Sequence, residues 1–370
     1  MLKSKLLVLL FTCLTPLCGS AVELLLWNAH SLEHLRPIVL ERFEKKTGHH
    51  IVQHHFRADE LRDKVMSSVV LPDLYFMPSD QLSNVDIYHL APWPDSVTQG
   101  QPLRADGQVG TKWYGIPVNQ GNQLVLYYRK DKVTPPKSLE SIPDGRLGWP
   151  RSQAYWFIPF LTAHDGWPLA GEGFGFDTPQ MIKALESYKA ISDRHPATRC
   201  ELTCNEQAFY EGKIDYLIDG DWAFQALKEQ LEGKLGVAVL PSLDGGQMQP
   251  MSSSYVLAMS QGLDSEKQAA AQALAHFLLS PEVQADLYQH SGLFPGIKSV
   301  GDALLPQMGD LRKGLYQQLL VSRPMPNSRQ MLIAWLVLGK GMEMLFNEEY
   351  LPDEIAQWMQ QRAAQEVTPR

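Results

Sequence analysis

Four histidines and two cysteines are the side chains of this sequence best suited to hold a metal ion: His49, His50, His54, His55, Cys200 and Cys204. His50, His54 and His55 fall in a predicted strand, where four residues span roughly 13 Å, so His50 and His54 lie too far apart to share an ion. The cysteine pair lacks the second pair of ligands that a structural metal site needs. In an exported protein, an even pair favours a local disulfide. We therefore expect a Cys200–Cys204 disulfide, no metal site and no cofactor.

The sequence carries none of the common catalytic motifs. It has no Gly-x-Ser-x-Gly elbow, no phosphate-binding loop, no His-Glu-x-x-His motif and no glycine-rich dinucleotide fingerprint between a strand and a helix. A glycoside hydrolase can use two carboxylates without any motif, so that class stays open as an alternative. We expect the protein not to be an enzyme.

Residues 1–21 have the composition of a secretory signal peptide. Lys3 and Lys5 form a basic start, residues 6–17 are an apolar run too short for a comfortable membrane span, and residues 19–21 are small. We predict cleavage after residue 21 and export to the periplasm. A lipoprotein is less favoured, because Cys18 is not preceded by small residues.

Acidic residues outnumber basic ones, 41 to 33, for a net charge of −8. Loss of Lys3 and Lys5 with the signal peptide makes the mature chain still more acidic. Such a balance argues against nucleic acid and anionic membrane surfaces as partners. A chain of 370 residues also exceeds what one core usually serves. Without a repeat or a linker, we expect two interleaved lobes.

Strands and helices alternate at the start of the chain. Apolar strands are predicted at residues 22–27, 50–56 and 72–77, separated by a helix that ends at Gly48 and a helix over 60–67. This order predicts a parallel α/β sheet. Ligands of such sheets bind beyond the carboxyl ends of the strands. Asn28 and Asp80, which follow two of these strands, are therefore expected on the ligand side.

The stretch 110–131 predicts a crossing from one lobe to the other. Pro117 excludes a helix interior and favours extended geometry around it. Residues 124–128 are large and apolar without alternation, as in a strand buried on both faces. The polar residues 119–122 interrupt this pattern, as a flexible and hydrated crossing requires. Two further crossings are predicted near residues 251–255 and 305–310.

Several motifs appear in the order found in maltose-binding-protein-like periplasmic solute-binding proteins, extracellular solute-binding protein family 1. They are Trp27-Asn28, Phe43–Gly48, Pro72–Phe76, the Tyr-Gly-Ile-Pro segment at 114–117, Tyr127–Asp131, Gly220-Asp221-Trp222, Gly236–Pro241 and Met325-Pro326-Asn327. Each motif is loose, and their order is what makes the chain resemble this family over essentially its whole mature length.

The resemblance implies an α/β periplasmic-binding-protein fold with two interleaved α/β domains joined by a hinge. The expected N-lobe comprises residues 22–120 and 256–308, and the expected C-lobe comprises residues 121–255 and 309–370. It further implies a monomeric periplasmic receptor that delivers a sugar or oligosaccharide to the permease of an ABC importer by hinge closure.

A sugar presents apolar faces and a rim of hydroxyls, which proteins meet with aromatic rings and planar polar groups in a cleft. The resemblance and the residue types select these ligand-binding candidates: Trp222, Trp335, Tyr155, Trp156, Asp80, Asp221, Asn28 and Asn122. His30 and Arg329 are secondary candidates. The competing interpretations are core packing for the rings, helix capping for the aspartates and turn formation for the asparagines. We predict that Tyr155 and Trp156 lie in an irregular stretch.

Three departures from the family pattern weigh against maltose itself rather than against a saccharide. Met77 replaces a cleft tryptophan, Gly121 replaces a glutamate and Gln81 replaces an arginine. The alternatives are a ligand-sensing subunit for a membrane sensor kinase, and a binder of a non-sugar solute such as a polyol or a metal ion. The tyrosine pair 127–128 also resembles that of ferric-ion binding proteins.

Overall fold

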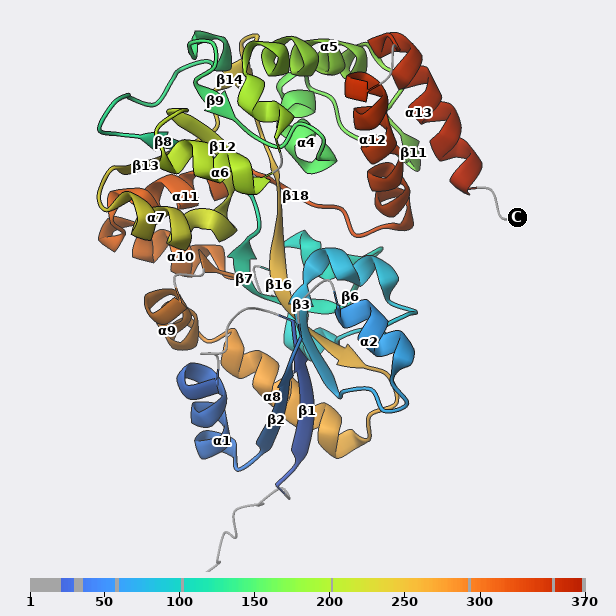
Figure 1. The fold of residues 1–370 in the computed structure, drawn as a ribbon. Coiled ribbons are helices and arrows are strands. Elements are labelled where there is room, and N and C mark those ends of the chain that lie inside the picture. Colours follow the sequence, from blue (N-terminus) through green and yellow to red (C-terminus); the bar gives the residue numbers. More distant parts are fainter. Residues whose placement is uncertain are drawn as a thin grey trace, which may run out of the picture.

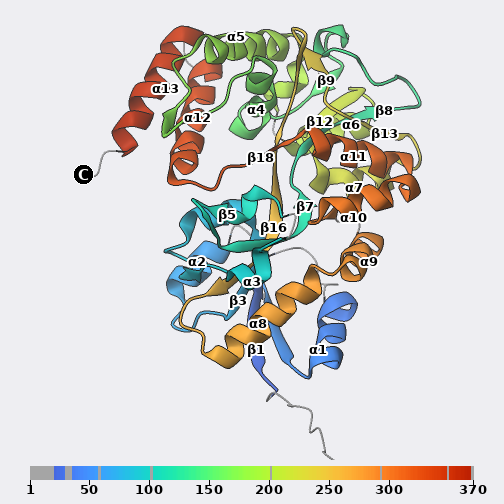
Figure 2. The same ribbon diagram turned by 180° about the vertical axis from the view of Figure 1, so that it is seen from behind.

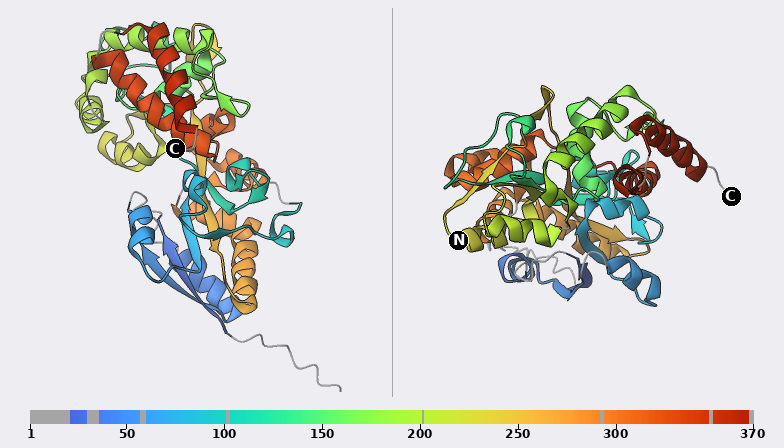
Figure 3. Two further views of the ribbon diagram at one scale, coloured as in Figure 1. Left: turned by 90° about the vertical axis from the view of Figure 1, so that its right-hand side faces the viewer. Right: turned by 45° about the horizontal axis from the view of Figure 1, so that its top comes forward.

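The computed structural model describes residues 21–29, 36–56, 60–100, 103–200, 202–291, 294–347 and 350–367. It has two α/β lobes, one above the other in Figure 1 and in the left view of Figure 3, joined by extended chain. The predicted fold class is confirmed.

The first lobe is built on one mixed sheet. Its strand order is β17-β7-β16-β3-β1-β2, with β4 and β18 also paired to β16. The bounds are β1 Glu23–Asn28, β2 His50–His55, β3 Leu74–Pro78, β4 Leu90–Ala91, β7 Gly115–Gly121, β16 Met251–Ser260, β17 Phe294–Pro295 and β18 Arg323–Pro324. As predicted, β1, β2 and β3 are parallel. β16 runs antiparallel between β3 and β7, so a late segment of the chain completes an early sheet.

Helices cover both faces of this sheet. They are η1 Arg36–Leu40, α1 Glu41–Thr47, α2 Leu61–Ser67, η2 Ser79–Asn84, α3 Asp95–Thr98, α8 Ser265–Leu278 and α9 Pro281–Ser291. Side chains alternate along β1: Leu24 and Leu26 pack in a cluster with Leu274 of α8, and Trp27 packs in another with Leu61 of α2. Seen from behind, α8 crosses the face of the sheet (Figure 2).

The second lobe has a four-stranded sheet in the order β13-β8-β12-β9. Its strands are β8 Leu124–Arg129, β9 Leu147–Gly148, β12 Tyr216–Gly220 and β13 Leu235–Ala238. Leu124 and Leu126 of β8 enter one core cluster, while Val125 and Tyr127 enter another on the opposite face. The prediction that this apolar run is a strand buried on both faces is confirmed.

The second lobe's helices flank that sheet. They are α4 Ala154–Ala163, α5 Pro179–Arg194, α6 Leu202–Tyr210, η6 Asp221–Ala223, α7 Phe224–Leu231, α11 Asp310–Val321, α12 Arg329–Asn347 and α13 Pro352–Val367. Helix α10 Lys298–Leu304 lies where the lobes meet, since it contacts α9 and β17 of the first lobe while Leu304 packs with second-lobe residues. The second lobe also has two-stranded ribbons, β10 Leu169–Ala170 with β11 Gly173–Phe174 and β14 Ser242–Leu243 with β15 Gly246–Gln247, and turns of 3-10 helix at η4 Leu139–Ser141 and η5 Pro196–Arg199. The ribbon of β5 Gln108–Val109 with β6 Lys112–Trp113 and the 3-10 turn η3 Ala105–Gly107 belong to the first lobe, and η7 Leu305–Gln307 follows α10.

The lobes are connected by the passage from β7 to β8 and by β16, which runs from one lobe towards the other in Figure 1. Polar side chains tie these strands together: Arg104 donates to the Gln120 side chain at 3.1 Å and to the Ser252 hydroxyl at 2.7 Å. Leu304 and Met308, near the third predicted crossing, pack in a cluster with Tyr127 of the second lobe.

One local prediction is wrong: Tyr155 and Trp156 lie in the first turn of helix α4, not in an irregular stretch. Pro159 stands inside this helix and cannot donate the bond that would reach the Tyr155 carbonyl. The proline lowers the helix signal of the sequence. Burial of nearly every residue from Trp156 to Ala163 stabilises the helix in spite of it.

The predicted disulfide between Cys200 and Cys204 is present, with the two Cα atoms 6.0 Å apart. It joins the chain before α6 to the first turn of that helix. Within the described ranges, no helix is both long enough and apolar enough to cross a membrane. Residues 1–20, which contain the predicted signal peptide up to its last residue, lie outside the described part.

Candidate functional site

A cavity of about 320 Å³ lies between the lobes, and we call it the cleft cavity. It is lined by Asp80, Asn122, Tyr155, Trp156, Trp222, Met325 and Trp335. Except for Met325, every one of these was a sequence-based candidate. Asp80 comes from η2 of the first lobe and Asn122 from the crossing, while the aromatic residues come from α4, η6 and α12 of the second lobe.

The aromatic side of the cavity is centred on Tyr155. Its ring centroid lies 6.2 Å from that of Trp222 and 6.0 Å from that of Trp335, with interplanar angles of 42° and 45°. Trp156 completes the group at 5.9 Å from Tyr155. Trp222 is 47% exposed, whereas Trp156 is only 7% exposed. The arrangement leaves the Trp222 and Trp335 rings partly exposed, while the buried Trp156 packs edge-on against Trp222 at 6.2 Å.

Hydrogen bonds fix the two α4 residues of this group. The Tyr155 hydroxyl lies 2.6 Å from the Asn122 carbonyl and 2.9 Å from the Met251 carbonyl, so it meets both crossings. Trp156 donates its indole N–H to the Ile218 carbonyl at 2.8 Å. Burial raises the pKa of Tyr155 well above its ordinary value, and the negative charges of Asp221 and Asp80 act in the same direction.

Asp80 faces the aromatic residues from the other lobe. Its Oδ1 atom is buried without a hydrogen-bond partner among the described residues. Burial raises the pKa of this carboxyl, and the backbone N–H groups of Asp80 and Gln81 oppose that rise. A buried acceptor without a partner is costly unless a ligand satisfies it. Asp80 is therefore suited to accept a hydrogen bond from a ligand hydroxyl.

Asp221 does not line the cavity and instead holds the crossing beside it. The backbone N–H groups of Gln123 and Asn122 bond to its carboxylate, while its own N–H donates to the Gln123 carbonyl at 3.0 Å. Burial raises the pKa of Asp221 to about 7. A Cβ atom at Gly121 would lie 2.7 Å from Asp221 Oδ2, so this carboxylate occupies the space that a side chain at 121 would need.

Two further residues of the crossings, Asn122 and Tyr255, lie at or near the cleft cavity. Asn122 has φ near 50° and donates its side-chain N–H to the Ser253 hydroxyl at 2.6 Å, which ties the two crossings together. Burial raises the pKa of Tyr255 to about 12, with the charges of Asp80 and Asp221 adding to the rise. Sequence reasoning missed Met325 as a lining residue, although it placed Met325 in a motif and Tyr255 in the second crossing.

The remaining candidates lie elsewhere. Asn28 is fully buried at the end of β1, opposite His55 and Phe76 in the sheet, and does not line the cleft cavity. Arg329 begins α12 and is exposed. His30 is outside the described residues. Met77, at the position of one family departure, is fully buried in the first lobe.

The chemistry of the cleft cavity suits a neutral ligand. Among the described residues that line it, there is no lysine, arginine or histidine to balance an anion. Aromatic rings on one side and amide and carboxylate groups on the other match the alternation of apolar faces and hydroxyls on a sugar.

His164, Ser187 and Asp244 form a cluster that contains the residue types of a catalytic triad but not its geometry. His164 Nε2 lies 3.1 Å from Ser187 Oγ and 3.8 Å from Asp244 Oδ2, so one ring nitrogen meets both groups. A nucleophile relay needs the two ring nitrogens to serve different partners. Over the described ranges, no three histidine, cysteine, aspartate or glutamate side chains come together in a way that could hold a metal.

The fold and the interlobe cavity define a two-lobe ligand-binding protein. Residues 39–309 match the bacterial extracellular solute-binding protein family, and the chain belongs to that family. It is similar, at 24% identity over 75% of its length and 71% of the relative, to a maltooligosaccharide ABC transporter solute-binding lipoprotein of Streptococcus pneumoniae.

Solved structures share the fold. A cyclo/maltodextrin-binding protein complexed with maltotetraose matches with a TM-score of 0.79 at 19% identity, over 94% of this chain and 97% of the other. The maltose-binding periplasmic protein MalE of Listeria monocytogenes, in complex with maltose, matches with a TM-score of 0.80 at 16% identity, over 94% and 99%. MalE of Bdellovibrio bacteriovorus, bound to maltotriose, matches at 0.74 and 22% identity, over 93% and 99%.

Proposed function

We propose that this protein is an exported receptor that binds a maltooligosaccharide in the cleft cavity and delivers it to an ABC importer. The observation that carries the proposal is the cleft cavity itself, where the rings around Tyr155 face Asp80 of the other lobe, whose Oδ1 atom has no hydrogen-bond partner among the described residues. Family membership and the maltooligosaccharide-binding relative support the same ligand class.

In this proposal the residues have distinct roles. Trp222 and Trp335 stack on the apolar faces of the sugar rings, since both present partly exposed indoles to the cavity. Asp80 accepts a hydroxyl hydrogen bond from the first-lobe side. Asn122 and Asp221 fix the backbone of the crossing through their hydrogen bonds. Trp156 and Tyr155 hold the stacking surface in place.

Transport follows from ligand-dependent closure. A ligand that contacts Asp80 of one lobe and Trp335 of the other binds best when the lobes approach, so it shifts the population towards the closed form. The membrane permease would then recognise that form. The predicted lobe limits, residues 22–120 with 256–308 and residues 121–255 with 309–370, belong to this proposal, as do signal-peptide cleavage, periplasmic location and a monomeric, non-enzymatic state.

Calorimetric titration of the mature protein with maltotetraose, maltotriose and maltose tests the ligand class. We expect saturable binding of at least one of these, with sorbitol and ferric ion giving no heat. Binding of sorbitol or ferric ion without any maltooligosaccharide would overturn the proposal. The sensor-kinase alternative has no structural observation in its favour, since the relative named above serves an ABC transporter.

A further inference from the structure

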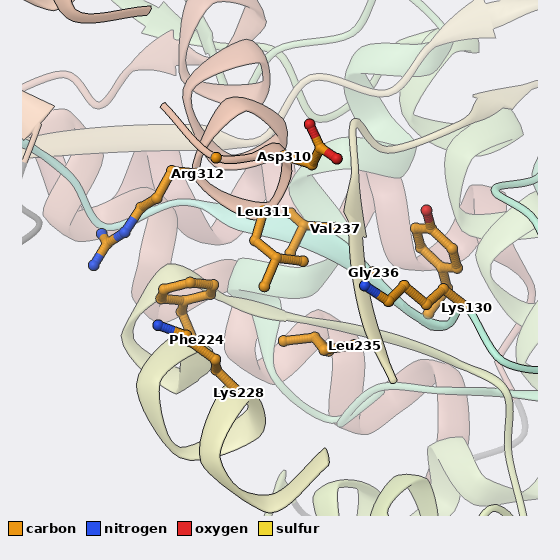
Figure 4. A pocket seen from close by; sticks show the side chains of 11 residues that line it. Lys130, Phe224, Lys228, Leu235, Gly236, Val237, Asp310, Leu311 and Arg312 are labelled. Carbon is orange, nitrogen blue, oxygen red and sulfur yellow. The ribbon is translucent and has the colours of Figure 1, made fainter. Parts of the chain in front are cut away.

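A second cavity, in the second lobe, is separate from the cleft. It measures about 560 Å³, and we call it the basic cavity (Figure 4). Its lining residues are Tyr128, Lys130, Phe224, Lys228, Leu235, Gly236, Val237, Gly309, Asp310, Leu311 and Arg312. They come from the end of β8 and the turn after it, from α7, from β13 and from the start of α11 with the residue before it, and none of them lines the cleft cavity. Its volume falls in the range of small-molecule sites.

The charges of the basic cavity are opposite to those of the molecule. Its lining includes three cations, Lys130, Lys228 and Arg312, and a single carboxylate, Asp310, in a chain of net charge −8. Neither the Lys130 nor the Lys228 amine has an ion-pair partner among the described residues. A cavity lined by more cations than carboxylates has a positive potential, which favours an anion there.

Of the three cations, Arg312 is the one whose side chain is held in place by packing. Its guanidinium carbon lies 4.7 Å from the centroid of the Phe224 ring, which is itself only 4% exposed. Burial lowers the pKa of Arg312, and the charge of Asp221, towards the cleft, opposes that change. A cation already oriented by an aromatic ring loses little side-chain entropy when it binds an anion.

The cations stand at two ends of an apolar surface. In Figure 4 the Lys228 amine and the Arg312 guanidinium lie on the Phe224 side, whereas the Lys130 amine lies on the opposite side near Gly236. Leu235, Val237 and Leu311 lie between the two ends. This spacing suits a ligand with acidic groups at both ends of a neutral body.

The N-terminus of helix α11 adds to the positive potential of the basic cavity. Gly309 occupies the N-cap position without a side-chain hydrogen bond, so the first N–H groups of this twelve-residue helix are left for another acceptor. A helix N-terminus favours negative charge. The carboxylate of Asp310, the first helical residue, is the one group here that would repel an anion.

We propose that the basic cavity is a second ligand site, which binds a small organic polyanion such as a polycarboxylate or a phosphorylated sugar. The assignment rests on the cavity, the three cations that line it and the apolar surface between its two ends. It does not depend on what the cleft cavity binds.

Calorimetry with citrate, fructose 1,6-bisphosphate and inorganic phosphate tests the site on the mature protein. We expect at least one of the two organic anions to bind saturably, and to bind more weakly as ionic strength rises. Inorganic phosphate, which cannot reach both ends, should bind at least about 10-fold more weakly. No binding of either organic anion would overturn the proposal, as would equal affinity for inorganic phosphate.

Charge reversal locates the binding. Lys228→Glu and Lys130→Glu should each weaken organic-anion binding about 10-fold or more. Lys45→Glu, an exposed first-lobe change of the same charge, should have no effect. All three variants should keep the melting temperature and maltotetraose affinity of the parent, which separates this site from the cleft. Equal weakening in all three would show a general charge effect and would refute the site.

Discussion

The Trp222 ring lies directly against the backbone of Gly220. A Cβ atom placed on Gly220 would come within 2.1 Å of the indole ring. Gly220 has φ −78° and ψ 159°, a backbone conformation that any residue adopts. The glycine is therefore required by the position of the Trp222 ring and not by the backbone, and the half-exposed indole would have to move for a larger residue.

Gly220→Ala should weaken maltooligosaccharide binding about 10-fold with little loss of stability, because the methyl group displaces the Trp222 ring. A double-mutant cycle with Trp222→Ala measures this by calorimetry. In the Trp222→Ala background, Gly220→Ala should add no further loss of affinity. Additive losses would mean that Gly220 acts on the site by some other route.

Trp222→Ala and Trp335→Ala should each weaken ligand binding by roughly 1–3 kcal/mol, the range for one stacked ring. That corresponds to about one to two decades in Kd. Because both rings are partly exposed, the melting temperature without ligand should fall by only a few degrees. The ligand-induced rise in melting temperature should be reduced or lost.

Trp149→Ala is the matched control for these variants. Trp149 is fully buried and donates its indole N–H to the Tyr188 hydroxyl at 3.0 Å. Its truncation should cost about 3–5 kcal/mol of stability. If the Trp222 and Trp335 variants behave like Trp149→Ala and retain ligand affinity, the two rings are core residues.

Asp219, two residues before Asp221, should make the free energy of unfolding fall as pH rises. Burial raises the pKa of Asp219 to about 8, the nearby Glu206 carboxyl adds to the rise, and a bond from the Gly220 N–H opposes it. The folded state therefore keeps a proton that an unfolded aspartate loses near pH 4. Between about pH 4 and pH 8 the folded state binds more protons, so the free energy of unfolding decreases with rising pH.

Asp219→Asn should flatten this pH dependence and should be more stable than the parent above about pH 8. Guanidinium unfolding at several pH values measures the slope, which for one proton is on the order of 1 kcal/mol per pH unit. Asp86→Asn, at an exposed position, should leave the slope unchanged. A slope in Asp219→Asn equal to that of the parent would contradict the assignment.

Saturating maltotetraose should reduce the radius of gyration measured by small-angle scattering, because the ligand joins Asp80 of one lobe to Trp335 of the other. The double variant Trp222→Ala/Trp335→Ala, at the same sugar concentration, should keep the radius of the unliganded protein. A parent protein that binds sugar with no change in radius does not work by closure.

Local patterns of the sequence determined much of this protein. The apolar run at β8 predicted a strand buried on both faces, and the alternating strands and helices predicted the parallel start of the first sheet. These patterns suffice because side-chain periodicity within one segment sets which faces are buried. Asp80 and the aromatic residues of α4, η6 and α12 were also named from the sequence.

Only the tertiary structure decided which distant segments meet. β16 enters the sheet between β3 and β7 and brings Tyr255 near Asp80. Packing buries Asn28 fully, although it follows a strand on the expected ligand side. The basic cavity joins Lys130, Lys228 and Arg312 from three separate elements. No local pattern encodes such meetings, because they depend on how whole elements pack, and burial then sets pKa values such as that of Asp219.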